Sequence, residues 1–217
     1  MRSVKFHDDD CRLCPRLTDY LKRTQSKFPK YRCLPVPSFG DPKAAVLIVG
    51  LAPGMHGANA TGRPFTGDHA GNLLYSTLFE YGFSNNAKSS NDGDGLRLYN
   101  CRIANAVKCL PPGNKPTINE IENCNNFLQM EISILERGSI LIALGKIAHD
   151  AILRALGLPM SKHKFGHGAE YFLESLGLLI LDSYHCSRYN TQTKRLTPKM
   201  FGDIFQRARE VIEKETL

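Results

Sequence analysis

An apolar segment at residues 45–49 runs directly into a long loop rich in glycine and proline, and this junction constrains the fold more than any other feature. A buried strand that empties into such a loop and then a helix is typical of α/β proteins, which bind ligands beyond the carboxyl ends of their parallel strands. Glycine lets the backbone approach a ligand closely, and Pro53 and Pro64 stiffen the loop. Because the loop also carries Phe65 and Asp68, we expect it to hold a ligand.

Three further apolar segments predict buried parallel strands, at residues 98–107, 139–144 and 178–184. Helical patterns lie between and after the strands, at residues 70–81, 117–137, 146–156 and 199–215. This alternation predicts a parallel sheet that is covered by helices on both faces. The 217 residues are most simply one domain, with residues 1–40 as a lead-in that contains a helix at 15–24.

The formal net charge of +7 suits a polyanionic partner such as nucleic acid, although many soluble proteins are modestly basic. The first ten residues lack the apolar core of a signal peptide. No stretch approaches the roughly 20 apolar residues that a membrane span needs. We therefore expect an intracellular protein whose seven cysteines are thiols or metal ligands rather than disulfides.

Four of the cysteines have a spacing that suggests a metal centre. Cys11 and Cys14 form a C-x-x-C pair, and Cys109 and Cys124 follow singly about a hundred residues later. Four thiolates are enough for a [4Fe–4S] cluster or for tetrahedral zinc. A redox C-x-x-C pair with two unrelated core cysteines is the third interpretation, and the spacing alone leaves all three open.

Polar side chains follow two of the predicted strands at the point where each strand ends. Asn105 lies near the end of the second strand, and His185 comes directly after the fourth. Each has an ordinary structural interpretation, but an amide can read a base edge and a histidine can act as an acid or base. Since parallel strands end at one edge of a sheet, Phe65, Asp68, Asn105 and His185 are expected to converge there. The basic residues of 183–196 suit phosphate contacts, or a solvated loop.

Five stretches together carry a resemblance to a known family. They are Gly50-Leu-Ala-Pro-Gly54 with Thr61-Gly-Arg-Pro-Phe-Thr-Gly-Asp68, Asn105-Ala-Val-Lys-Cys109 with the Leu-Pro-Pro-Gly-Asn-Lys-Pro-Thr that follows it, the loop after Tyr184, and the segments 143–148 and 165–169. Over residues 11 to about 196 the chain resembles the iron–sulfur uracil-DNA glycosylases, most closely the type called family 5.

The resemblance implies a three-layer αβα sandwich around a central four-stranded parallel sheet. It implies a monofunctional, base-flipping hydrolysis of the N-glycosidic bond of uracil in DNA, with other deaminated bases such as hypoxanthine as further substrates. The expected protein is a monomer in the cytoplasm of a prokaryote, an archaeon in the first instance, and is associated with the nucleoid. A non-catalytic, metal-stapled nucleic-acid-binding module is the alternative.

The resemblance also assigns roles to individual residues. Asp68 and His185 are the expected catalytic pair, and the [4Fe–4S] ligands are Cys11, Cys14, Cys109 and Cys124. The expected substrate-binding residues are Gly50, Ala52, Gly54, Phe65, Asn105 and His185, and the expected DNA contacts are Arg63, Ser187, Arg188 and Asn190. The sequence departs from related families at Leu51, where family 4 has Glu, and at Cys186, where Pro is common. The apolar Leu51 leaves the carboxylate role to Asp68.

Overall fold

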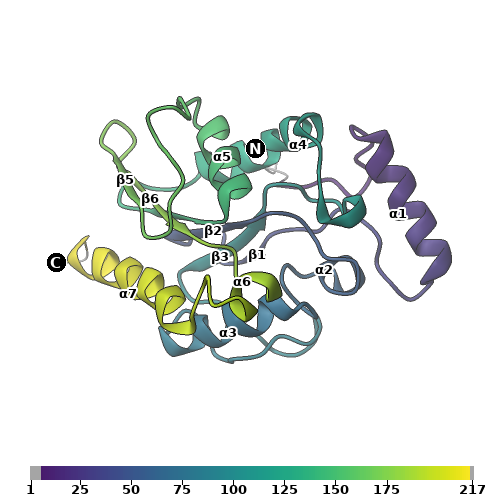
Figure 1. Ribbon diagram of the computed structural model, residues 1–217, viewed down its shortest axis with the longest axis horizontal. Coiled ribbons are helices and arrows are strands. Elements are labelled where there is room, and N and C mark those ends of the chain that lie inside the picture. Colours follow the sequence, from purple (N-terminus) through teal and green to yellow (C-terminus); the bar gives the residue numbers. More distant parts are fainter. Residues whose placement is uncertain (1–5, 216–217) are drawn as a thin grey trace.

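The computed structural model describes residues 6–215 and shows an α/β fold built on one mixed sheet (Figure 1). The sheet has six strands in the order β1-β3-β2-β4-β6-β5. Its four central strands pair in parallel: β2 (Val46–Gly50), β3 (Cys101–Asn105), β4 (Ile140–Leu144) and β6 (Leu178–Ser183). Two edge strands, β1 (Phe39–Gly40) and β5 (Glu170–Leu173), pair antiparallel. The expected sheet of four parallel strands is therefore corrected to a mixed sheet of six.

The central and edge strands differ in burial, which explains why the sequence pattern predicted only the central ones. Every residue of β2, β3, β4 and β6 is buried, so these strands are mostly apolar in sequence. β5 is largely open to solvent, and β1 has only two residues. Such edge strands carry neither an apolar run nor a clear alternation.

Helices cover both faces of the sheet, as expected from the alternation of strands and helices (Figure 1). α3 (His69–Glu80) and α7 (Pro198–Glu215) pack on the face that includes Ile48. α4 (Ile118–Ser133) and α5 (Lys146–Ala155) pack on the opposite face, which includes Leu47. Successive residues of β2 thus contribute to opposite cores, as the period of two in a strand requires.

The lead-in contains α1 (Pro15–Lys27), which is longer than the helix expected there, and the first five residues of the expected lead-in lie outside the described part of the chain. α4 begins with a capping box between Thr117 and Glu120. It ends at Ser133, four residues before the end of the predicted segment. Among residues 6–215, no helix combines the length and apolar character needed to cross a bilayer.

Three short helical segments occupy the loops at the carboxyl edge of the sheet. They are α2 (Ala58–Thr61) after β2, a 3-10 turn (Pro112–Asn114) after β3, and α6 (Arg188–Gln192) after β6. None is long enough to show a helical period, so the sequence pattern predicts loops at these positions. They shape the edge of the sheet where the candidate site lies.

Candidate active site

A pocket of about 420 Å³ lies at the carboxyl edge of the sheet. The loops after β2, β3 and β6 line it, as expected for an α/β site. Its lining residues are Leu51, Ala52, Gly54, Phe65, Asp68, His69, Ala70, Asn105, Asn114, His185, Ser187 and Arg188. The four residues expected to converge, Phe65, Asp68, Asn105 and His185, are all among them.

Asn105 contributes the most unusual polar group of the pocket. It is the last residue of β3 and lies beside Gly50, the last residue of β2. Its side chain is 2% exposed, and within the described residues its Oδ1 has no hydrogen-bond partner. A buried unpaired acceptor costs about 1–3 kcal/mol. A Cβ at position 50 would lie 2.6 Å from that oxygen, so Gly50 leaves room for the amide.

Phe65 forms an aromatic wall of the pocket in a strained conformation. Its φ is +58°, a left-handed value that is rare for an aromatic residue and costs about 1–3 kcal/mol. Its ring lies 5.9 Å from the ring of His185, with the planes inclined by 26°. Gly71 makes the turn possible, because a Cβ there would lie 1.7 Å from the Phe65 carbonyl oxygen. Such local strain is typical of functional sites.

Asp68 directs its carboxylate toward the loop after β2 rather than toward its own helix. The residue is the N-cap of α3, but its side chain accepts no capping hydrogen bond from that helix. The carboxylate instead lies against Gly57, where a Cβ would come within 2.1 Å of it. Burial raises the pKa of Asp68, and the backbone N–H of Ala58 and the nearby His56 oppose that rise. The structure thus holds a desolvated carboxylate in the pocket.

His185 lies two residues after the end of β6, and its environment keeps the imidazole neutral. Burial lowers the pKa of His185 to about 4, so the ring is uncharged near neutral pH and can donate one N–H. Asn190 holds the backbone here, because its Nδ2 donates to the His185 carbonyl at 2.8 Å. Ser187 caps α6 by accepting from the Asn190 backbone N–H at 3.4 Å. Ser187 and Asn190 therefore shape the loop that carries His185.

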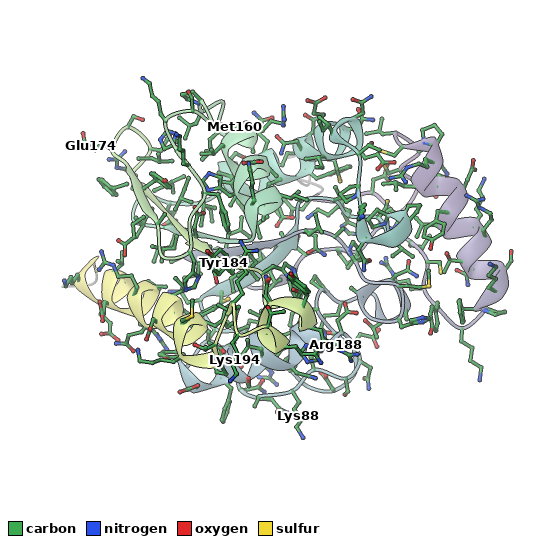
Figure 2. All side chains as sticks on the ribbon, in the orientation of Figure 1. Lys88, Met160, Glu174, Tyr184, Arg188 and Lys194 are labelled. Atoms are coloured by element: carbon green, nitrogen blue, oxygen red, sulfur yellow. The ribbon has the colours of Figure 1, made fainter. Side chains whose placement is uncertain are left out.

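Of the expected DNA contacts, Arg188 is exposed at the rim of the pocket, and Arg63 lies elsewhere. Figure 2 labels Arg188 beside α6, on the same part of the molecule as Lys194. Arg63 is 5% exposed, and its Nη1 donates to Asp94 at 2.8 Å and to Ser89 at 3.0 Å. A guanidinium that is buried and already paired is not presented to a phosphate. The structure therefore gives Arg63 a position that differs from the one expected of a DNA contact.

Sequence reasoning did not single out Gly57, His56 or His69. The importance of Gly57 comes from the Asp68 carboxylate packed against it. His69 adjoins Asp68 in sequence and lines the pocket. Its position next to that carboxylate was the sequence signal that could have identified it as a pocket residue. His56 affects the pKa of Asp68 across the loop, which no local pattern reveals.

The four cysteines of the predicted metal centre line one small cavity beside α1. Cys14 directly precedes α1, Cys109 follows the end of β3, and Cys124 lies in α4. Two N–H groups point at these sulfurs: the Lys108 backbone N–H at 3.2 Å from Cys124 and the Asn123 amide at 3.7 Å from Cys14. The structure thus brings together thiols that are about a hundred residues apart in sequence.

Four thiols line this one cavity, which suits either of the metal centres that the cysteine spacing suggested. As the side chains lie in this structure, no three His, Cys, Asp or Glu groups among the described residues are close enough to hold one ion. Burial and the neighbouring thiols raise the pKa of Cys109 to about 12, and burial raises that of Cys124 to about 11. Four thiolates here therefore require cationic metal to offset their charge.

Comparisons with known proteins identify the family of the chain. The family model described as "Uracil DNA glycosylase superfamily" matches residues 37–209. The chain is 46% identical to the type-5 uracil-DNA glycosylase of Thermus thermophilus, with 93% of each chain covered. It is 41% identical to the type-5 uracil-DNA glycosylase of Mycobacterium leprae, over 93% of this chain and 91% of that one.

The similarity extends, at lower identity, to a second type of the same enzyme. The type-4 uracil-DNA glycosylase of Archaeoglobus fulgidus is 31% identical over 153 residues, which cover 69% of each chain. The match of the family model over most of the chain and the near-complete coverage of the type-5 relatives lead to one conclusion. The chain belongs to the uracil-DNA glycosylase superfamily.

Proposed function

We propose that this protein removes uracil from DNA by hydrolysing its N-glycosidic bond. The observation that carries the proposal is the buried, unpaired amide oxygen of Asn105 at the end of β3. Uracil presents a donor at N3 beside an acceptor at O4. The Asn105 Oδ1 would accept from N3–H while its Nδ2 donates to O4. This pairing supplies the hydrogen bond that the amide lacks.

The target nucleotide must leave the duplex before it can reach this pocket. Unstacking a base costs a few kcal/mol, least at a mismatch such as U·G. Phe65 offers the flipped base a stacking surface, and backbone groups of the loop between Gly50 and Gly54 close over it. Arg188, at the pocket rim, is placed to hold a neighbouring phosphate. The strained backbone at Phe65 keeps its ring in place before the substrate arrives.

The reaction breaks the bond between C1′ of the sugar and N1 of uracil, and the bonding electrons leave with the base. The neutral His185 donates a hydrogen bond to O2, where negative charge develops. Asp68 in its ionised form stabilises the positive charge on the sugar. It also accepts a proton from the water whose oxygen bonds to C1′. Each role supplies on the order of 10²–10⁴-fold.

The four cysteines are proposed to hold a [4Fe–4S] cluster, because they line one cavity and four thiolates are the ligand set of such a cluster. When bound, the cluster would supply a cross-link rather than reaction chemistry. Cys11 and Cys14 would join the lead-in to the segment that carries Cys109 and Cys124. The protein is proposed to act as a monomer.

The range of bases is proposed to extend to hypoxanthine. Leu51 lines the pocket with an apolar side chain, so this part of the wall has no side-chain hydrogen-bonding group that would select one base over another. Hypoxanthine also presents a ring N–H beside a carbonyl oxygen, the pair that Asn105 can read. A pocket that relies on one amide for recognition therefore has little with which to exclude it.

Release of the free base tests the proposal. Single-turnover reactions with oligonucleotides containing uracil, hypoxanthine or thymine should yield free uracil and an abasic product, slower release of hypoxanthine, and no thymine. A non-catalytic binding module would shift the same oligonucleotides in a gel and release no base, and that result would refute the proposed function.

A further inference from the structure

One face of α1 is strongly basic and makes no ion pair. Arg23 and Lys27 lie one helical turn apart, Lys22 adjoins Arg23, and Lys30 follows just beyond the helix end. All four side chains are exposed, and none forms a salt bridge with another described residue. Asp19 is the acidic residue on this face, and Arg23 bonds its backbone carbonyl rather than its carboxylate. This basic face is therefore available to an anionic partner.

The end of the basic face is fixed to the loop after β2. Just after α1, the rings of Phe28 and Tyr31 stack with their centroids 4.8 Å apart, and both meet His56 edge-on. The Tyr31 hydroxyl lies 2.9 Å from His56 Nδ1 in a hydrogen bond. His56 belongs to the loop after β2 and influences the charge of Asp68. The basic face thus ends next to the loop that holds the catalytic carboxylate.

Backbone hydrogen bonds make this attachment rigid. The N–H of Arg32 donates to the Ala60 carbonyl and the N–H of Cys33 donates to the Asn59 carbonyl, each at 3.1 Å. Both acceptors lie in α2, within the loop after β2. A chain held at its end by two main-chain bonds and an aromatic cluster cannot swing freely. The positive charges of α1 therefore keep a defined place beside the pocket.

α1 and α6 flank the pocket from opposite sides of the sheet edge. α1 packs against the loops that follow β2 and β3, and contacts Ala52, Val107 and Leu110. α6 follows β6, and β4 separates β6 from β2 in the sheet. Figure 1 shows α1 at one end of the molecule and α6 nearer its centre. A DNA strand with its flipped nucleotide in the pocket would meet Arg188 on one side and α1 on the other.

We propose that the basic face of α1 is a second DNA-binding surface, which contacts backbone phosphates on one side of the flipped nucleotide. This inference rests on the proposed function, because it takes DNA as the partner. Lysines at a helix C-terminus also complement the helix dipole, so Lys27 has a structural role in addition. Lys30 lies beyond the end of the helix, so the helix dipole does not explain its presence.

Salt-dependent binding to undamaged duplex DNA tests the surface. Removal of one phosphate contact should reduce the slope of log K against log salt by about 0.9. The double variant Lys27→Ala/Lys30→Ala should therefore lower the slope by nearly two units. Lys43→Ala is the matched control, because this exposed lysine precedes β2 at the opposite, amino edge of the sheet. Equal slopes for the double variant, the control and the wild type would overturn the inference.

Duplexes that carry one abasic-site analogue, which fixes the register, and that are shortened on one side of it locate the contact. On a duplex cut short on the side that reaches α1, wild type and double variant should bind alike, whereas cutting the other side should preserve their difference. A difference that survived both truncations would refute the assigned position. The salt-slope measurement uses undamaged DNA, so it remains interpretable even if the protein releases no uracil. In that case the proposed function fails and the DNA-binding surface does not.

Discussion

Gly57→Ala should disable the enzyme while leaving it folded. The hydrogen of Gly57 faces the Asp68 carboxylate, and a methyl group there would lie 2.1 Å from the carboxyl carbon. Restoring a contact distance of 3.4 Å moves the carboxyl group by about 1.3 Å. A misplacement of about 1 Å can cost 10²-fold in rate. We therefore expect the rate to fall by at least about 10²-fold, which corresponds to about 2.7 kcal/mol of transition-state stabilisation.

The fold should tolerate the same change, because the group that must move is the end of one side chain. Overpacking of this kind costs about 1–3 kcal/mol, against a typical total stability of about 5–15 kcal/mol. Gly166→Ala provides the matched control: its methyl group would meet Ala169 at an ordinary 3.8 Å, and the residue is not part of the pocket lining.

Single-turnover release of uracil at saturating enzyme measures the effect, and thermal unfolding verifies that each variant is folded. The rate should fall in Gly57→Ala and stay near the wild-type value in Gly166→Ala. A folded Gly57→Ala variant with the wild-type rate would show that the position of the Asp68 carboxylate does not limit the reaction. The assignment of Asp68 as the group that stabilises the sugar cation would then be wrong.

Four further predictions concern the cluster, recognition, pH and Arg63. Cys109→Ser should abolish the broad visible absorbance of anaerobically prepared protein, whereas Cys101→Ser should keep it; stoichiometric zinc without iron in the wild type would contradict the cluster. Asn105→Asp should collapse uracil release, because a carboxylate repels O4, and normal release would mean that another residue reads the base. Burial raises the pKa of Asp68, so ionisation of this carboxyl group lowers the stability of the folded protein as pH rises through that pKa. Asp68→Asn should therefore raise the Tm more at pH 8 than at pH 4, and it should abolish excision. A lower Tm of the variant at pH 8 would refute this reasoning. Arg63→Ala removes the ion-pair partner of Asp94, so it should lower the free energy of urea unfolding by about 3–5 kcal/mol and change the salt slope of DNA binding little. Unchanged stability with a smaller salt slope would instead identify Arg63 as a phosphate contact.

The central sheet and the long helices could be predicted because their burial leaves a periodic or continuous apolar signal. β2 is buried on both faces, so its sequence is an unbroken apolar run. α4 carries a capping box, which marks its first turn. β5 and α6 leave no such signal, since an exposed edge strand and a helix of five residues depend on tertiary contacts. The pocket was predictable because all parallel strands end at one edge.

Arg63 shows what a resemblance in sequence cannot reveal about a site. The resemblance implied that Arg63, which lies in the glycine-rich loop, contacts DNA. Its actual partners, Ser89 and Asp94, belong to the polar segment 84–95, to which the sequence assigned no role. Although burial opposes it, the hydrogen bond from Arg63 and several backbone N–H groups hold the pKa of Asp94 well below its usual range. Pairing between distant loops leaves no local pattern, so the sequence could not reveal it.

Three energetically unfavourable features lie together in the pocket. A bound nucleotide would relieve or use each of them. Asn105 keeps a buried amide oxygen without a partner among the described residues, Asp68 keeps a carboxylate where burial disfavours its charge, and Phe65 keeps a left-handed backbone. The unpaired amide and the left-handed backbone each cost on the order of 1–3 kcal/mol, a large share of a marginal stability. Natural sequences depart from local rules mainly at functional sites. In the proposed mechanism, uracil gives the amide its donor, and the developing sugar cation gives the carboxylate its counter-charge. The features that weaken the folded protein are therefore the ones to which the proposal assigns base recognition and stabilisation of the cation.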